Sequence, residues 1–373
     1  NHYRVWRLLP IAQTHPMKFE NQYSLPNQWL HRLSFATTGA QVGLADIESR
    51  LFKKQLEPVI SERPVFVTAL PRAGTTLLLN LLVGTGEFAS HTYRDMPFVL
   101  CPMLWQRFAS IFGTESIARE RAHGDGVSIS LDSPEALEEI IWQQFWSGHY
   151  EQDRIKPWKQ GKNEQFRAFF IDHMRKIIAL RSPEEPARYA SKNNMNIARL
   201  RALKNLAPDC ALIVPFREPL QHASSLLRQH RGFIRMHAED RFAHRYMSGT
   251  GHFDFGENLR PINFGNWLHD ANYPDAMTLG FWLEYWVATY SHVLNHHAKA
   301  ANLLSFEELV SQPEHTLERI EQTLKLTTPQ ALTRQASDLR AVTEHPVDTA
   351  DVSDQLLSKA KSIHWALLEA SHN

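Results

Sequence analysis

The sequence predicts an α/β protein, because short apolar strands are followed directly by helical patterns at several places. Residues 64–70 form an apolar, partly β-branched run between prolines, and the residues from Thr76 onward suit a helix. A second apolar run, residues 209–216, precedes a helix that Pro219 opens. A third strand is expected at residues 302–306, again before a helical pattern. This alternation is typical of an α/β fold.

The loop after the first strand has the chemistry of an anion-binding cradle. The first turn of a helix leaves backbone N–H groups without intrahelical partners, and the helix dipole favours an anion there. Gly74 allows the backbone to approach a ligand closely, and Thr75 and Thr76 add hydroxyl donors. The loop departs from the nucleotide-triphosphatase pattern, because Ala69 replaces its first glycine and Thr75 replaces its lysine. With Arg72 earlier in the loop, the pattern favours an anion other than the β- and γ-phosphates of a magnesium nucleotide.

Two motifs together resemble those of the sulfotransferases that use 3′-phosphoadenosine-5′-phosphosulfate (PAPS). Pro-Arg-x-Gly-Thr-Thr after a buried strand is similar to the loop that binds the 5′-phosphosulfate. These enzymes also hold the 3′-phosphate with an arginine at the end of a later strand and a serine eight positions on, matched here by Arg217 and Ser225. Glu218 stands where the family usually has aspartate. The resemblance implies a PAPS site made of Arg72, Ala73, Gly74, Thr75, Thr76, Arg217 and Ser225.

The resemblance also implies the architecture. It covers about residues 64–325 and implies a three-layer α/β/α fold of the P-loop-like sulfotransferase type, with a central parallel sheet and the ligand at the carboxyl ends of the strands. Residues 1–60 and 326–373 are expected to be helical additions within one domain. An irregular segment at about 229–275, rich in histidine, arginine and aromatic residues, is expected to face the acceptor.

The implied reaction is in-line transfer of a sulfuryl group to a hydroxyl or amine, which needs a general base. In several branches of the family the base is an acidic residue a little over twenty positions beyond the start of the loop, and Asp95 stands at that spacing. We therefore expect Asp95 to be catalytic, with Arg72 stabilising the charge that grows on the leaving phosphate. The alternative for Asp95 is a structural role, in which it pairs with Arg94 or caps the turn before Pro97.

Two other residues are candidates for the base. Glu138 shares a helix face with Trp142 on a helix predicted to begin after an N-cap at Ser133, with Pro134 as its first residue. The alternative is that Glu138 is a solvated helix charge, since acidic residues are favoured near helix N-termini. His123 is the second candidate, because some sulfotransferases use histidine.

Composition limits the partners. Lys plus Arg equals Asp plus Glu at 40 each, so no net charge points to nucleic acid. Cys101 and Cys210 give neither a disulfide framework nor metal-ligand spacing, and no apolar run is long enough to span a bilayer, so a cytoplasmic enzyme without a metal is expected. The acceptor is expected to be a small molecule, a carbohydrate or a lipid.

Two other functions are compatible with these patterns. A phosphotransferase with an altered nucleotide loop would require Mg²⁺ and a carboxylate at a strand end. A non-catalytic nucleotide-binding protein would keep Arg217 and Ser225 but would lack a general base.

Overall fold

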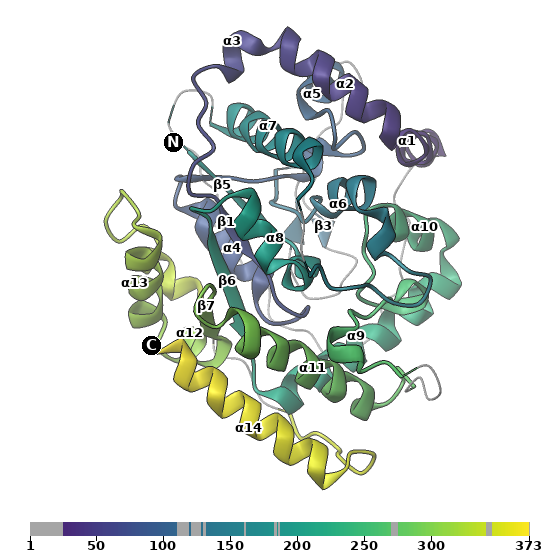
Figure 1. The fold of residues 1–373 in the computed structure, drawn as a ribbon, viewed down its shortest axis with the longest axis vertical. Helices are drawn as coiled ribbons and strands as arrows, with labels where there is room; N and C mark the ends of the chain where they lie inside the picture. The colour runs from purple at the N-terminus through teal and green to yellow at the C-terminus, as the bar shows by residue number, and fades with distance from the viewer. Residues whose placement is uncertain are drawn as a thin grey trace.

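A five-stranded parallel sheet forms the centre of the structure (Figure 1). The computed structural model describes residues 25–109, 119–120, 128–129, 132–159, 162–182, 185, 187–269, 275–340 and 345–372. In spatial order the strands are β2 (Phe88–Ala89), β5 (Arg188–Lys192), β1 (Val65–Val67), β6 (Ala211–Phe216) and β7 (Asn302–Ser305). Every neighbouring pair is parallel, which confirms the predicted α/β fold with a central parallel sheet.

Helices cover both faces of the sheet, because successive side chains of each strand point to opposite faces. Val65 and Ile213 pack on one face with four elements: α4 (Thr75–Gly84), α12 (Phe306–Ser311), α13 (Pro313–Leu324) and the 3-10 helix η7 (Thr333–Asp338). Phe66 and Leu212 pack on the other face, in a core to which several helices contribute, among them α6 (Glu139–Phe145), α7 (Glu164–Arg181), α8 (Leu200–Leu206), α9 (Pro219–Glu239) and α11 (Leu279–His297). The three layers of the predicted architecture are therefore present.

Strand order places a topological switch point between β1 and β6. From β1 the chain runs out to β2 and β5 on one side, and it then crosses to β6 and β7 on the other. The helix after β1 covers one face of the sheet and the helix after β6 covers the other. Ligands of open α/β sheets bind at such a switch point, outside the carboxyl ends of the strands.

The remaining elements lie around this core. Figure 1 shows the N-terminal helices as a purple arm along one edge and the C-terminal helix in yellow beside α11. The peripheral elements are α1 (Leu25–Ala36), α2 (Thr38–Leu51), α3 (Lys53–Leu56), η1 (Tyr93–Asp95), α5 (Pro102–Ala109), β3 (Arg119–Glu120), β4 (Ser128–Ile129), η3 (Ser147–His149), η4 (Asn194–Ala198), α10 (Arg241–Gly249), η5 (Gly256–Asn258), η6 (Phe264–Asn266) and α14 (Asp354–Ser371). Cys101 and Cys210 are free and buried. The division into one domain with helical additions stays a prediction.

Two predictions about local structure are wrong. The helix expected to begin after Ser133 begins at Glu139, because Pro134 lies in an antiparallel bridge with Thr92 instead of in a first helical turn. The irregular segment expected from residue 229 is helical as far as residue 249, in α9 and α10. Asp240 separates these two helices and caps the second one, accepting hydrogen bonds from two backbone N–H groups.

Candidate active site

The loop between β1 and α4 has an unusual backbone. Arg72 has φ 70° and Gly74 has φ 86°, both in the left-handed region. A β-carbon at Gly74 would lie 2.6 Å from the ring of Phe306, so both the conformation and the packing require glycine there. For Arg72 this conformation is strained, and strained residues of this kind are concentrated at ligand sites.

Arg217 joins the two sequence motifs at the switch point. It follows β6 directly, and its Nη1 donates a hydrogen bond to the backbone oxygen of Arg72, at 3.1 Å. Its guanidinium carbon lies 4.9 Å from the centre of the Phe306 ring, and its Nε lies 3.9 Å from a carboxylate oxygen of Glu307. Two motifs whose arginines lie 145 residues apart in the sequence thus meet at one place.

Three guanidinium groups crowd this place. Burial, with the charges of Arg72 and Arg228 nearby, lowers the pKa of Arg217, although Glu307 acts in the opposite direction. Burial and the charge of Arg72 also lower the pKa of Arg228. Arg228 is positioned by Ser224, whose hydroxyl accepts a hydrogen bond from its Nη1 at 2.7 Å. Like charges held together in this way attract an anion, which relieves their mutual repulsion.

His222 on α9 holds the loop in place through a hydrogen bond to its backbone. It lies on α9, is completely buried, and its Nε2 donates a hydrogen bond to the backbone oxygen of Pro71 at 2.7 Å. Burial, with the charge of Arg217, lowers the pKa of His222 to about 3. The imidazole is therefore neutral in the folded protein at all moderate pH values.

We expect His222 to make the protein sensitive to acid. In the unfolded chain this histidine takes up a proton near pH 6.5, whereas in the folded protein it stays neutral. Below pH 6.5 the unfolded state therefore binds more protons than the folded state, so the free energy of unfolding falls as pH falls. Above pH 6.5 this residue has no effect on stability. At pH 5 the loss from this residue is about 2 kcal/mol. Urea unfolding at pH 7 and pH 5 checks this: wild type should lose about 2 kcal/mol more than His222→Gln, which keeps an N–H donor. Equal losses in the two proteins would contradict the assignment.

Comparisons with known proteins agree with this geometry. Residues 64–253 match the model of the sulfotransferase family, which is half of the chain and includes the loop, Arg217 and Ser225. The chain belongs to the sulfotransferase family.

A solved sulfotransferase shares the fold at low sequence identity. STF9 from Mycobacterium avium is 14% identical, with a TM-score of 0.52 over 90% of this chain and 83% of that one. STF1 from Mycobacterium tuberculosis H37Rv is 15% identical, with a TM-score of 0.46 over 86% of this chain and 81% of that one. The search of curated proteins finds no match.

Asp95 of this sulfotransferase is deeply buried in a capping motif. Its side chain is 1% exposed, and its carboxylate accepts hydrogen bonds from the backbone N–H of Thr92 (2.9 Å), from His91 Nδ1 (3.2 Å) and from Arg181. Burial alone would raise the pKa of Asp95, but the hydrogen bond from His91 and the charge of Arg181 outweigh it and lower the pKa. Asp95 thus caps a turn, as its structural alternative predicts. Its partner is Arg181, since Arg94 pairs with Asp132. Its role as the base stays a prediction.

Glu138 belongs to a buried polar cluster beside β5, so its interpretation as a solvated helix charge is wrong. It is 1% exposed, and its carboxylate accepts hydrogen bonds from Trp142 Nε1 (2.9 Å), Asn196 Nδ2 (3.3 Å) and the hydroxyl of Tyr189 (3.4 Å). The predicted contact between Glu138 and Trp142 is confirmed. His123, the other candidate base, lies outside the described residues.

The neighbouring Glu139 anchors the same cluster. It pairs with the fully buried Arg199, and it also accepts hydrogen bonds from Asn193 (2.7 Å) and from the hydroxyl of Tyr150. The guanidinium carbon of Arg199 lies 3.9 Å from the centre of the Trp142 ring. These contacts hold the segment that follows β5 against the end of β1, where Asn193 N–H donates to the backbone oxygen of Val67 at 3.0 Å.

The structure adds residues that sequence reasoning did not assign to the site. Asn194 accepts a hydrogen bond from the hydroxyl of Thr75 (3.4 Å), and its backbone oxygen accepts one from Thr68 (3.2 Å), so it contacts the loop directly. Phe306 and His222 support the loop, and the sequence offers no signal for either, because each acts through a tertiary contact. Ser225 is buried on α9, and its predicted contact with a 3′-phosphate is untested.

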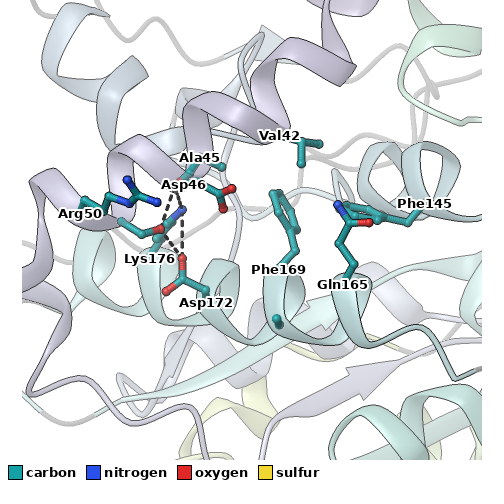
Figure 2. Close-up of a pocket in the computed structure, with 11 residues that line it drawn as sticks. Val42, Ala45, Asp46, Arg50, Phe145, Gln165, Phe169, Asp172 and Lys176 are labelled. Carbon is teal, nitrogen blue, oxygen red and sulfur yellow. Dashed lines mark hydrogen bonds and ion pairs between the residues drawn. The ribbon is translucent and has the colours of Figure 1, made fainter.

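A cavity of about 470 Å³ lies between α2 and α7, apart from the loop (Figure 2). Phe145 and Phe169 line one end, whereas Arg50, Asp172 and Lys176 line the other. Lys176 is 2% exposed and lies 3.1 Å from carboxylate oxygens of both Glu48 and Asp172, so its charge is already balanced. No residue of the loop or of the arginine cluster lines this cavity.

Within the described ranges, no helix combines the length and the apolar character needed to cross a membrane. The same residues contain no group of three or more histidine, cysteine, aspartate or glutamate side chains arranged to hold a metal ion.

Proposed function

We propose that this sulfotransferase transfers a sulfuryl group from PAPS to a hydroxyl or amine of a small-molecule acceptor, leaving 3′-phosphoadenosine-5′-phosphate. The observation that carries the proposal is the hydrogen bond from Arg217 to the backbone of Arg72, which brings the two motifs together at the switch point. A nucleotide with phosphates at both its 5′ and its 3′ positions has anions that match these two motifs. Mononucleotides with only a 5′-phosphate chain would leave Arg217 without a partner phosphate.

In this proposal the 5′-phosphosulfate lies on the loop. Arg72, Ala73, Gly74, Thr75 and Thr76 supply backbone N–H groups at the N-terminus of α4, and Thr76 adds a hydroxyl. Arg72 stabilises the charge that grows on the 5′-phosphate as the bond from its oxygen to sulfur breaks. Because these donors are held by the fold before the ligand binds, no reorganisation is needed during the reaction.

The 3′-phosphate is held at the end of β6 in this proposal. Arg217 and Ser225 are its ligands, and Arg228 adds a second positive charge. A guanidinium gives forked, charged hydrogen bonds to a phosphate, so this site discriminates PAPS from nucleotides without a 3′-phosphate.

A phosphotransferase is the competing function, and the loop disfavours it. A phosphate-binding lysine would stand at Thr75, a residue that is buried and whose hydroxyl bonds to Asn194. The acceptor is proposed to be a small molecule, with carbohydrates and lipids included. A cytoplasmic location is proposed from the two free, buried cysteines.

Label transfer tests the proposal. The purified chain is incubated with PAPS carrying ³⁵S and a panel of phenols, sugars, hydroxylated lipids and amines, and in parallel with γ-³²P-ATP and Mg²⁺. The proposal predicts ³⁵S in at least one acceptor class and no ³²P transfer. Transfer of ³²P without ³⁵S would overturn it.

A further inference from the structure

We infer that Asp254, instead of the predicted Asp95, is the catalytic base, the carboxylate that takes the proton from the acceptor hydroxyl; this inference rests on the proposed function. Asp254 lies in the irregular stretch after α10, and no sequence motif points to it. Its position, its exposure and its hydrogen bonds each support this role.

A short chain of hydrogen bonds places Asp254 at the loop. The hydroxyl of Thr75 donates to Asn194 Oδ1 at 3.4 Å, and Nδ2 of the same Asn194 donates to Asp254 Oδ2 at 3.2 Å. One amide side chain therefore separates Asp254 from the first residue of α4. The hydroxyl of Thr68 fixes the backbone of Asn194, so the amide is held in place. Asp254 therefore lies beside the N-terminal turn of α4, where the proposed donor binds.

The residues on either side of Asp254 are buried and hold the segment in place, whereas the Asp254 side chain is partly accessible to solvent. Phe253 and Phe255 on either side are 2% and 1% exposed, whereas the Asp254 side chain is 9% exposed. Gly251 has φ 78°, and a β-carbon there would lie 2.4 Å from the side chain of Glu139, so the chain passes tightly against α6. The ring of His252 stacks on Phe233, with ring centres 5.3 Å apart. Asp254 is thus held by a rigid turn.

Free lone pairs distinguish Asp254 from Asp95, Glu138 and Glu139. Asp95 accepts hydrogen bonds from three groups, one of them the guanidinium of Arg181, and Glu139 is paired with Arg199 and accepts from two more residues. Glu138 accepts from three side chains. Within the described part of the chain, Asp254 accepts one hydrogen bond, from Asn194, and has His252 Nε2 at 3.9 Å. A base needs an oxygen that is not already saturated by donors, and Asp254 has one.

The step can be written with its atoms and electrons balanced. The acceptor oxygen forms a bond to sulfur while the bond from sulfur to the bridging oxygen of the 5′-phosphate breaks. That oxygen keeps the electron pair and leaves as part of 3′-phosphoadenosine-5′-phosphate, with Arg72 beside it. The hydroxyl proton moves to a carboxylate oxygen of Asp254. The proton then leaves Asp254 for solvent when the product is released.

Release of ³⁵S-sulfate from labelled PAPS, with water as the acceptor, tests the inference on the full chain. Asp254→Asn should lower the rate at saturating PAPS by about 100-fold or more, the usual contribution of a general base. The dissociation constant for 3′-phosphoadenosine-5′-phosphate should stay within about twofold of wild type, because the donor site is untouched. Asp254→Glu keeps a carboxylate and should recover part of the lost rate.

A control variant separates the base from its neighbours. Glu257→Gln, three residues further along at an exposed position, should leave the rate within about twofold. The inference is overturned by an Asp254→Asn rate within about threefold of wild type. It is also overturned if wild type binds 3′-phosphoadenosine-5′-phosphate but releases no sulfate above the buffer rate. A wild-type protein that does not bind this nucleotide contradicts the proposed function instead.

Discussion

We expect Arg217→Ala to weaken the binding of 3′-phosphoadenosine-5′-phosphate by about 10- to 150-fold and to leave the binding of AMP unchanged. The reason is that Arg217 is proposed to bind only the 3′-phosphate, and a charged hydrogen bond contributes about 1.5 to 3 kcal/mol. Calorimetric titration with the two nucleotides measures both affinities. The variant should therefore no longer distinguish a nucleotide with a 3′-phosphate from one without it.

The control for this prediction lies on the same helix. Arg231 on α9 donates a hydrogen bond to the backbone oxygen of Met277, and it does not belong to the arginine cluster. Arg231→Ala should keep both affinities within about twofold of wild type. If Arg217→Ala weakened both nucleotides equally, Arg217 would be supporting the loop through its bond to Arg72 instead of binding the 3′-phosphate.

We expect Arg199→Met to lower the free energy of unfolding by about 3 to 5 kcal/mol, because it leaves the buried Glu139 without its counterion. Urea unfolding at neutral pH measures the loss. Adding Glu139→Gln removes the uncompensated charge, so the double variant should be more stable than Arg199→Met alone.

Arg201→Met is the matched control, since Arg201 lies two residues away at an exposed position. Its effect should be within about 0.5 kcal/mol. A loss below about 1 kcal/mol in Arg199→Met would show that the ion pair does not stabilise the fold. The segment that carries Asn193 and Asn194 would then have to be held by other contacts.

Sequence reasoning predicts the sheet well, because the strands carry local signals. The runs that contain β1 and β6 are apolar and bounded by prolines or by a charged turn, and Pro219 marks the start of α9. It predicts the start of α6 wrongly, because Ser133 and Pro134 have the composition of a helix start, whereas Pro134 lies in a bridge with Thr92. A local sequence pattern carries no information about a bridge partner that lies 42 residues away in the sequence.

The two halves of the candidate site differ in the same way. The donor half follows short motifs, so Arg72 and Arg217 can be predicted from the sequence and then lie together. The acceptor half depends on tertiary packing. Burial could not be inferred for Glu138 from its helix position, and Asp254 is linked to Thr75 only through Asn194. Residues that meet only through such tertiary contacts cannot be identified from their spacing in the sequence.

Calorimetric titration of the purified chain with 3′-phosphoadenosine-5′-phosphate, and separately with ATP and Mg²⁺, tests the central claim most directly. The account predicts tight binding of the first nucleotide and none of the second, because the loop and Arg217 are matched to a 5′-phosphate and a 3′-phosphate. A preference for ATP with Mg²⁺ would contradict the account and favour a phosphotransferase.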